Sequence, residues 1–320
     1  MDYAGGVEFS EGIHPPVSFH GMAAATGGAF HNSVSTVAGD RRAVLVLVPR
    51  RAERALEAVE TLCSRGHSVL ASWKECGAHQ LDAAWNRSGS EEVFQRIGKT
   101  AAAWVAASPA AKEFLARRMP HARVLELPTP YPLDVPGWKR DAPYTSRRGI
   151  FIGTREWREP SRRHRDAMRI AAALARRLPE TRITVVNRDG IMGLLRALSL
   201  CGPGVRTLRP MEYRRYLDCM ARHRIVLQRD ASGVPGQVAG DAALAGVPCL
   251  GGNGMVDRLV FPHLPGADAS DDEILACATS LLTSSEAWKE AVETAEENAM
   301  EKVSFRAFRE RLSLVGSLGP

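Results

Sequence analysis

Apolar runs of strand length alternate along the chain with segments of helical periodicity. In the first half, the strand-length runs are 17–22, 43–48, 68–73, 101–107 and 123–127. The helical segments are 51–64, 79–97 and 110–118. The last of these follows Ser108 and Pro109, a favoured cap and first helical residue. Strands that alternate with helices predict a parallel sheet with crossover helices.

The second half repeats this alternation. Its strand-length runs are 149–152, 182–186, 205–208, 225–228 and 247–250. Its helical segments are 161–177, 211–221, 237–245, 271–282, 285–300 and 304–314. The pattern therefore predicts an α/β protein with two Rossmann-like domains.

A proline-dense segment separates the two halves. Residues 128–136 read PTPYPLDVP, and a polar run follows as far as Arg148. Proline cannot continue a helix or a central strand, so we expect this segment to connect two domains. The predicted organisation is an N-terminal domain over 1–140, a C-terminal domain over 141–303 and a final helix over 304–320.

The composition is that of a globular protein, with 45% hydrophobic residues among 320. The six cysteines are scattered without a Cys-x-x-Cys pair, which favours a reduced, cytoplasmic protein without structural zinc. The sequence contains neither an apolar run of membrane-spanning length nor the layout of a signal peptide. The net charge of +6 suits nucleotide phosphates, an anionic acceptor, nucleic acid or an acidic membrane surface.

The most informative stretch is 225–254, which reads IVLQRDASGVPGQVAGDAALAGVPCLGGNG. A strand leads into a loop with Gly233, Pro235 and Gly236, and a helix is expected from Gln237 to Ala245 before the next strand. In a parallel sheet, this order directs backbone N–H groups and the positive end of a helix beyond the strand ends. The stretch therefore predicts a phosphate-binding site.

The run DAALAGVPCL, from Asp241 to Leu250, resembles the donor-site helix of GT-B glycosyltransferases, especially the retaining group of glycogen and sucrose-phosphate synthases. The resemblance implies two domains that face each other across a cleft, with Asp241 on the ribose hydroxyls of a nucleotide-sugar. Eight positions earlier, where the family has a Glu near the sugar, this chain has Gly233. Asp230 or a backbone group would have to replace that Glu.

The resemblance also implies contacts to the rest of the donor. Arg155 follows the first strand of the second half, where the family places a cation on the diphosphate, and Arg162 or Arg163 would replace a further Lys. Arg162 and Arg163 are equally compatible with a solvated helix face, whereas Arg155 is better explained by a phosphate contact. The loop that starts at Leu208 would hold the base. The expected donor-binding residues are Arg155, Arg162, Arg163, Leu208, Gly233, Val234, Pro235, Gly236, Gln237 and Asp241.

His79, Glu75 and Asp230 are the candidate catalytic residues. His79 and Glu75 are four residues apart and would share one face of a helix after the strand at 68–73. There they would act as acid–base partners or form an ordinary polar helix start.

The acceptor side has weaker candidates. GT-B enzymes often carry a glycine-rich loop after their first strand, which Gly27 and Gly28 resemble, although paired glycines also mark surface turns. His31 and Lys74 complete this set.

The expected function is transfer of a sugar from a nucleotide-sugar donor to an acceptor, with retained anomeric configuration. No metal-binding or cofactor fingerprint occurs, so we expect no metal and no cofactor besides the donor substrate. Two other classes stay open: a non-catalytic nucleotide-sugar or partner-binding protein, and a nucleic-acid-binding or nucleic-acid-modifying protein. Retention is implied by the resemblance alone, and the sequence itself leaves the anomeric outcome, sugar, base, acceptor and oligomeric state open.

Overall fold

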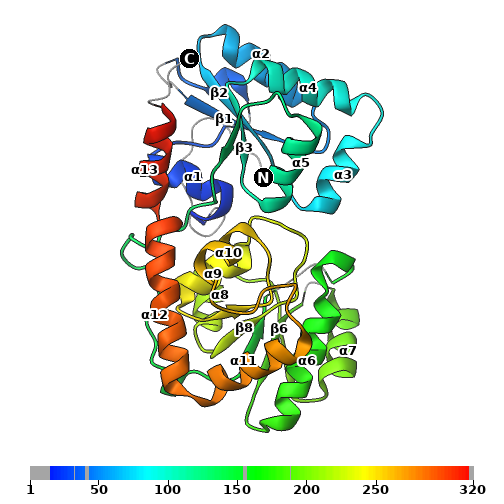
Figure 1. Ribbon diagram of the computed structural model, residues 1–320, viewed down its shortest axis with the longest axis vertical. Helices are drawn as coiled ribbons and strands as arrows, with labels where there is room; N and C mark the ends of the chain where they lie inside the picture. Colours follow the sequence, from blue (N-terminus) through cyan, green and yellow to red (C-terminus); the bar gives the residue numbers. More distant parts are fainter. Residues whose placement is uncertain (1–14, 32, 40–42, 154–156, 188, 317–320) are drawn as a thin grey trace.

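The computed structural model describes residues 15–31, 33–39, 43–153, 157–187 and 189–316. Its strands form two separate parallel sheets, one in each half of the chain (Figure 1). Helices pack on both faces of each sheet. The predicted α/β class with two Rossmann-like domains is confirmed.

The first sheet contains, in this order, β1 (Ala43–Val48), β2 (Ser68–Trp73), β3 (Ala103–Ala106) and β4 (Val124–Glu126). One face is covered by α2 (Glu53–Ser64), α3 (Ala78–Trp85), α4 (Ser90–Thr100) and α5 (Pro109–Arg118). The other face is covered by α1 (Ser18–Thr26) and α13 (Phe305–Gly316). The helix α13 follows the second domain in sequence but packs on the first (Figure 1).

The second sheet has β5 (Ile150–Ile152) at its centre. On one side of β5 lie β6 (Ile183–Val186) and then β7 (Val205–Leu208), and on the other side lie β8 (Ile225–Leu227) and then β9 (Cys249–Leu250). One face carries α6 (His164–Arg177), α7 (Gly190–Cys201) and α11 (Asp271–Thr283). The other carries α8 (Tyr213–Met220), α9 (Gln237–Ala245), α10 (Met255–Val260) and much of α12 (Ser285–Lys302). Short 3₁₀ turns occur at η1 (Val34–Thr36), η2 (Tyr144–Ser146) and η3 (Pro160–Arg162).

The chain crosses between the domains at two points that lie side by side. Tyr131, in the proline-dense segment, forms a parallel bridge with Ser304 and donates its backbone N–H to the carbonyl of Val303 at 2.8 Å. The Asp134 carboxylate accepts hydrogen bonds from the N–H groups of Phe305 and Arg306, which caps α13. The proline-dense segment and the start of α13 are therefore held together by hydrogen bonds.

The structure corrects several predicted elements. The strand expected at 17–22 is wrong, because this segment begins α1 and buries Met22 and Ala25 against the first sheet. The single helix expected at 79–97 is two helices, and Gly89, with a φ of +74°, precedes the second. The helices α7 and α10 were not predicted. No described helix is long and apolar enough to cross a membrane.

Candidate functional site

The two domains meet where loops leave the carboxyl ends of their strands. The N–H group of Ala78, at the start of α3, donates to the carbonyl of Ser232 at 3.0 Å. The N–H group of Ala110, in the first turn of α5, donates to the carbonyl of Gly233 at 3.1 Å. The predicted phosphate-binding loop thus contacts the positive ends of two helices of the first domain.

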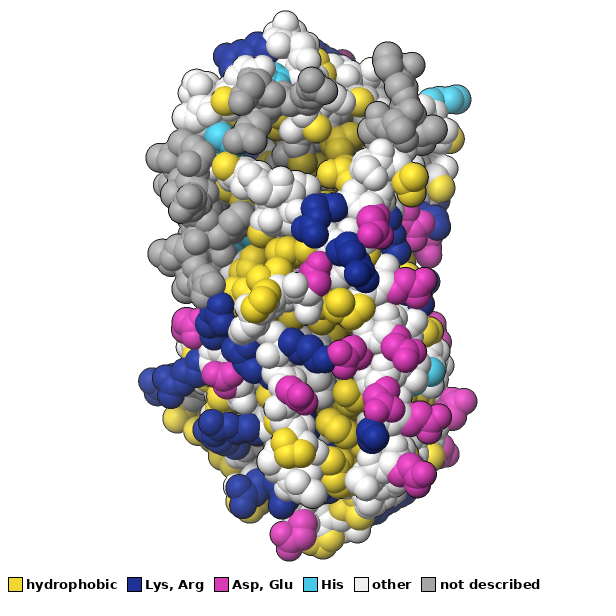
Figure 2. All heavy atoms as spheres, turned by 90° about the vertical axis from the view of Figure 1, so that its left-hand side faces the viewer, with side chains coloured by type: hydrophobic (Ala, Val, Ile, Leu, Met, Phe, Trp, Pro, Cys, Tyr) yellow, Lys and Arg dark blue, Asp and Glu magenta, His cyan; other side chains and the backbone are white. Residues whose placement is uncertain are grey.

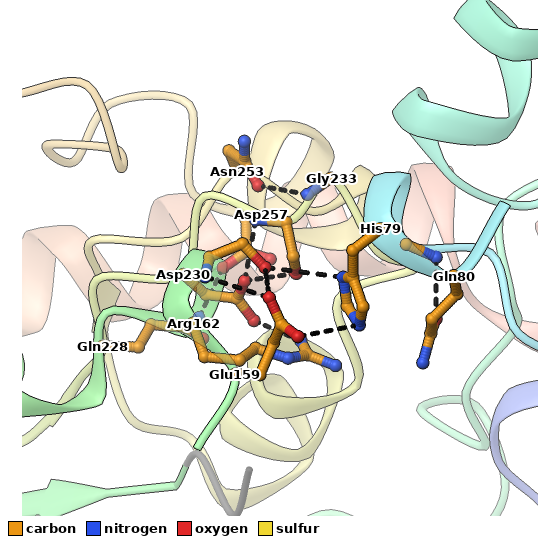
Figure 3. Close-up of polar contacts among 12 residues, drawn as sticks. His79, Gln80, Glu159, Arg162, Gln228, Asp230, Gly233, Asn253 and Asp257 are labelled. Carbon is orange, nitrogen blue, oxygen red and sulfur yellow. Dashed lines mark hydrogen bonds and ion pairs between the residues drawn. The ribbon is translucent and has the colours of Figure 1, made fainter. Parts of the chain in front are cut away.

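The second domain holds the same loop from behind. The N–H group of Gly233 donates to the side-chain oxygen of Asn253 at 2.8 Å (Figure 3). The N–H groups of Met255 and Val256, in the first turn of α10, donate to the carbonyls of Val234 and Pro235 at 3.1 and 3.0 Å. These bonds fix the path of the loop as far as Gly236, after which α9 begins at Gln237.

Gly233 is required by its conformation and by its neighbour. Its φ is +62°, and a Cβ atom built on it would lie 3.1 Å from the Cβ of Ala110. A Glu at this position would be strained and would compete with α5 for space. The first domain therefore closes on the position where the GT-B family carries its Glu.

Asp230 lies in the same loop and is buried. One carboxylate oxygen pairs with the guanidinium of Arg162, and the other accepts hydrogen bonds from the N–H and hydroxyl of Ser232 (Figure 3). Two of the residues predicted for this site are thus in direct contact. Arg162 could therefore bind a donor phosphate only if its guanidinium contacted Asp230 and the phosphate together, or left Asp230 for the phosphate.

His79 points from α3 across the domain boundary. Its Nε2 lies 3.4 Å from a carboxylate oxygen of Glu159, and its Nδ1 lies 3.4 Å from the hydroxyl of Ser161 (Figure 3). Partial burial disfavours the charged form of Glu159, but hydrogen bonds from Ser161 outweigh it and lower the pKa of this carboxyl. The result is an imidazole beside a carboxylate that stays ionised, an arrangement suited to acid–base chemistry.

The predicted partner of His79 is therefore corrected. Glu75 lies in the bend before α3 and is exposed, because the helix begins only at Ala78. The two residues do not share a helix face. Lys74 is likewise exposed in this bend.

Asp257 is a buried carboxylate behind the loop. It accepts a hydrogen bond of 2.7 Å from the side-chain amide of Gln228 (Figure 3). Burial, reinforced by the charge of Asp230, raises the pKa of Asp257 to about 7. Asp257 therefore titrates close to neutral pH, next to the candidate site.

Asp241 is not open to solvent. It is 3% exposed, and its carboxylate accepts a hydrogen bond of 2.5 Å from the hydroxyl of Tyr213, at the start of α8. The expected contact to ribose would thus have to replace an existing internal contact.

The remaining donor-site candidates have different positions. Arg155 lies outside the described residues. Arg163 turns toward Asp166 and the carbonyl of Ala267. Leu208 is a buried residue of β7, and its carbonyl accepts the N–H of Asn187 at 2.8 Å.

The structure does not bring Gly27, Gly28 and His31 to this site. They follow a helix rather than the first strand, and Gly27 ends α1 with a φ of +63°. Gly28 and His31 line a largely apolar cavity of about 650 Å³ between α1, β1, α2 and α13. Figure 2 shows hydrophobic side chains gathered in the upper half of this face, where the first domain lies.

Sequence reasoning missed several residues of the network: Glu159, Asn253, Asp257, Gln228 and Tyr213. Asp257 carried a local signal, because an acidic residue three positions after Gly254 is typical of a first helical turn. Glu159 and Tyr213 carried none, since their partners are far away in the sequence. Among the described residues, no group of three or more His, Cys, Asp or Glu side chains could hold a metal ion.

No family model matches the sequence, and no curated protein does. Solved structures do match. The E. coli trehalose-6-phosphate structure with bound UDP-2-fluoro glucose aligns at a TM-score of 0.66 and 10% identity, over 88% of this chain and 74% of its own. Sucrose-phosphate synthase from Thermosynechococcus elongatus aligns at a TM-score of 0.61 and 12% identity, over 86% of this chain and 73% of its own.

The chain has the GT-B fold. A putative UDP-N-acetylglucosamine 2-epimerase from Listeria monocytogenes also aligns, at a TM-score of 0.55 and 13% identity, over 86% of this chain and 74% of its own. At these identities the likeness concerns the fold alone. GT-B proteins with different reactions therefore share the architecture, and the reaction has to be argued from the residues.

Proposed function

We propose that this GT-B protein is a glycosyltransferase that moves a sugar from a nucleotide-sugar to an acceptor. The observation that supports this best is the polar network in which His79 of the first domain meets Glu159, Arg162 and Asp230 of the second. It lies at the carboxyl ends of both sheets, where ligands of parallel α/β folds bind. One of the aligned structures is a sucrose-phosphate synthase and another contains UDP-2-fluoro glucose, which fits the same substrate class.

In this proposal the second domain binds the donor. The first turn of α9, which begins at Gln237, offers N–H groups to the diphosphate, and Arg162 and Arg155 add positive charge. Departure of the nucleoside diphosphate builds up negative charge, which these groups stabilise. The proposal assigns no role to a metal ion.

His79 is the proposed acid–base residue on the acceptor side. Glu159 orients its ring, and its carboxylate lies beside the positive charge that forms when His79 takes the proton of an acceptor hydroxyl. Attack assisted in this way, from the face opposite the leaving group, would invert the anomeric centre. The family resemblance instead implies retention, and the anomeric configuration of the product distinguishes the two.

The test is turnover of a panel of nucleotide-sugars, measured as release of the nucleoside diphosphate. We expect His79→Ala to lower kcat by about 10²-fold or more. The matched control is His121→Ala, an exposed histidine after α5, which should leave kcat unchanged. If a nucleotide-sugar binds but no nucleoside diphosphate is released, the non-catalytic alternative is favoured. If the nucleotide-sugar stays intact but its sugar is epimerised, the protein is an epimerase and not a transferase.

A nucleic-acid partner receives less support. The face in Figure 2 carries both basic and acidic side chains, without a continuous basic surface. Affinity for nucleic acid that falls steeply with salt would contradict this view.

A further inference from the structure

Asp241 and Tyr213 form a closed pair at the position where the donor ribose is expected. The Tyr213 hydroxyl donates to the Asp241 carboxylate at 2.5 Å, and the two residues are 9% and 3% exposed. Burial, and then the charge of Asp241, raise the pKa of Tyr213 well above its ordinary value. The phenol therefore keeps its proton and acts as the donor in this bond.

Tyr213 is placed so that its side chain can leave without unwinding its helix. It is the first residue of α8, and it follows the loop 209–212, most of which is exposed. The carboxylate of Glu212 accepts the N–H groups of Arg214 and Arg215, so the helix start is capped by a neighbouring residue. Rotation of Tyr213 thus breaks one side-chain hydrogen bond and no backbone hydrogen bond.

A second phenol lies close to Asp241. Tyr131 is fully buried, and its hydroxyl lies beside the side chain of Thr129. Burial, and then the nearby charge of Asp241, raise its pKa. This phenol therefore also keeps its proton beside the Asp241 carboxylate.

We propose that Tyr213 governs ribose recognition: its hydroxyl occupies the Asp241 carboxylate in the empty protein, and a ribose hydroxyl of the bound donor replaces it. This inference rests on the proposed function, because it assumes a nucleotide-sugar in the second domain. Binding then exchanges one hydrogen bond for another, so the ribose contact adds less affinity than a contact to a free carboxylate would.

Tyr213→Phe tests this exchange. The empty variant leaves the Asp241 carboxylate without this donor, so its thermal midpoint should fall. A ribonucleotide restores the missing bond, so the variant should bind it about three- to tenfold more tightly than the wild-type protein. A merely structural Tyr213 would lower the midpoint without tightening the complex.

The measurement is isothermal titration with UDP, GDP, ADP and CDP, followed by the 2′,3′-dideoxy form of whichever binds. The gain should appear with the ribonucleotide and be absent with the dideoxy form. The matched control is Tyr144→Phe, which removes a hydrogen bond of 2.8 Å to Leu282 at the base of the second domain. It should lower stability without changing either affinity.

Asp241→Asn supplies a second variant if Tyr213→Phe does not fold. It should bring the affinities for the ribo and dideoxy forms close together. The proposal is overturned if Tyr213→Phe binds both forms like the wild-type protein, or gains equally for both, while the wild-type protein binds a nucleotide. If no nucleotide binds the wild-type protein, the proposed function fails first and the ribose exchange fails with it.

Discussion

Asp257 occupies a space that three glycines leave open for it. A Cβ atom on Gly236, Gly252 or Gly254 would lie 2.7, 1.9 or 2.6 Å from its carboxyl oxygens. The charged groups that act on it are Asp230, which raises its pKa, and Arg258, which lowers it. The Asp257 carboxyl therefore fills the space between Gly236 and the turn at Gly252 and Gly254, where its negative charge is poorly solvated.

This cost predicts an unusual dependence of stability on pH. The pKa of Asp257 is about 7 in the folded protein and 3.8 in its ordinary setting, so the folded state binds more protons between these values. Its contribution to the free energy of unfolding is therefore greatest below pH 4 and is lost as the pH rises toward 7. Asp257→Asn removes this loss. Between pH 5 and 7 the variant should gain about 2 kcal/mol relative to the wild-type protein, measured by urea unfolding; parallel pH curves would contradict the assignment.

Gly233 gives a second prediction at this scale. Because its φ is +62° and Ala110 lies against it, Gly233→Ala should cost about 1–2 kcal/mol of stability. Gly204→Ala is the matched control, since a Cβ there meets nothing within 4 Å and its φ is not positive. Chemical unfolding of both variants checks this, and equal effects would show that the contact with α5 is not tight.

Single residues were predictable where local sequence decides their role. His79 and Asp230 do reach the place where the domains meet, because each follows a strand at its carboxyl end. Glu75 was misplaced, because the helix start at Ala78 depends on the Gly77 cap and on the contact with Ser232. The pairing of Asp241 with Tyr213 could not be predicted, since no pattern links residues on different helices.

At the scale of elements, α9 is fixed to the interdomain connection. A Cβ on Gly240, in the middle of α9, would lie 1.9 Å from the Tyr131 ring. The ring thus packs directly on the helix backbone. This contact joins α9 to the crossing point at Ser304.

Gly240→Ala should therefore destabilise the protein, although the same change in an unobstructed helix interior adds about 1 kcal/mol. We expect a loss of about 2 kcal/mol or more, because neither the ring nor the backbone can move away freely. In a Tyr131→Leu background, Gly240→Ala should cost less stability than it does in the wild-type protein, because the ring that obstructs the new Cβ atom is absent. A thermodynamic cycle from urea unfolding measures this coupling, and a coupling near zero would contradict it.

The strands were the most predictable elements, since β1, β2 and β7 have the predicted bounds. Parallel strands buried on both faces appear as continuous apolar runs. The first forty residues were the least predictable. There the run at 17–22 fits either a strand or a buried helix, and only packing against α13 decides.

In the whole molecule, the two domains are held together at the loop that carries Ser232 and Gly233. The contacts of Ala78 and Ala110 with this loop and the His79–Glu159 pair all cross the boundary. The predicted cleft is therefore closed at these points. A nucleotide-sugar would enter the site when these contacts open, and it would be held there when they re-form.

Ala110→Leu should act as a wedge. Its larger side chain meets Gly233, so the radius of gyration without ligand should increase in small-angle scattering. Glu113→Leu, on the exposed side of the same helix, is the control and should leave it unchanged. An unchanged radius in both variants would indicate that the domains remain closed by other contacts.

The proposed function requires that a nucleotide-sugar binds where the two sheets face each other. Hydrogen–deuterium exchange with and without UDP-glucose, UDP-N-acetylglucosamine, GDP-mannose and ADP-glucose tests it most directly. We predict that one of them slows exchange in 228–241 and 251–257, and in the starts of α3 and α5. No protection with any of the four, or protection confined to the cavity beside α1, would contradict the claim.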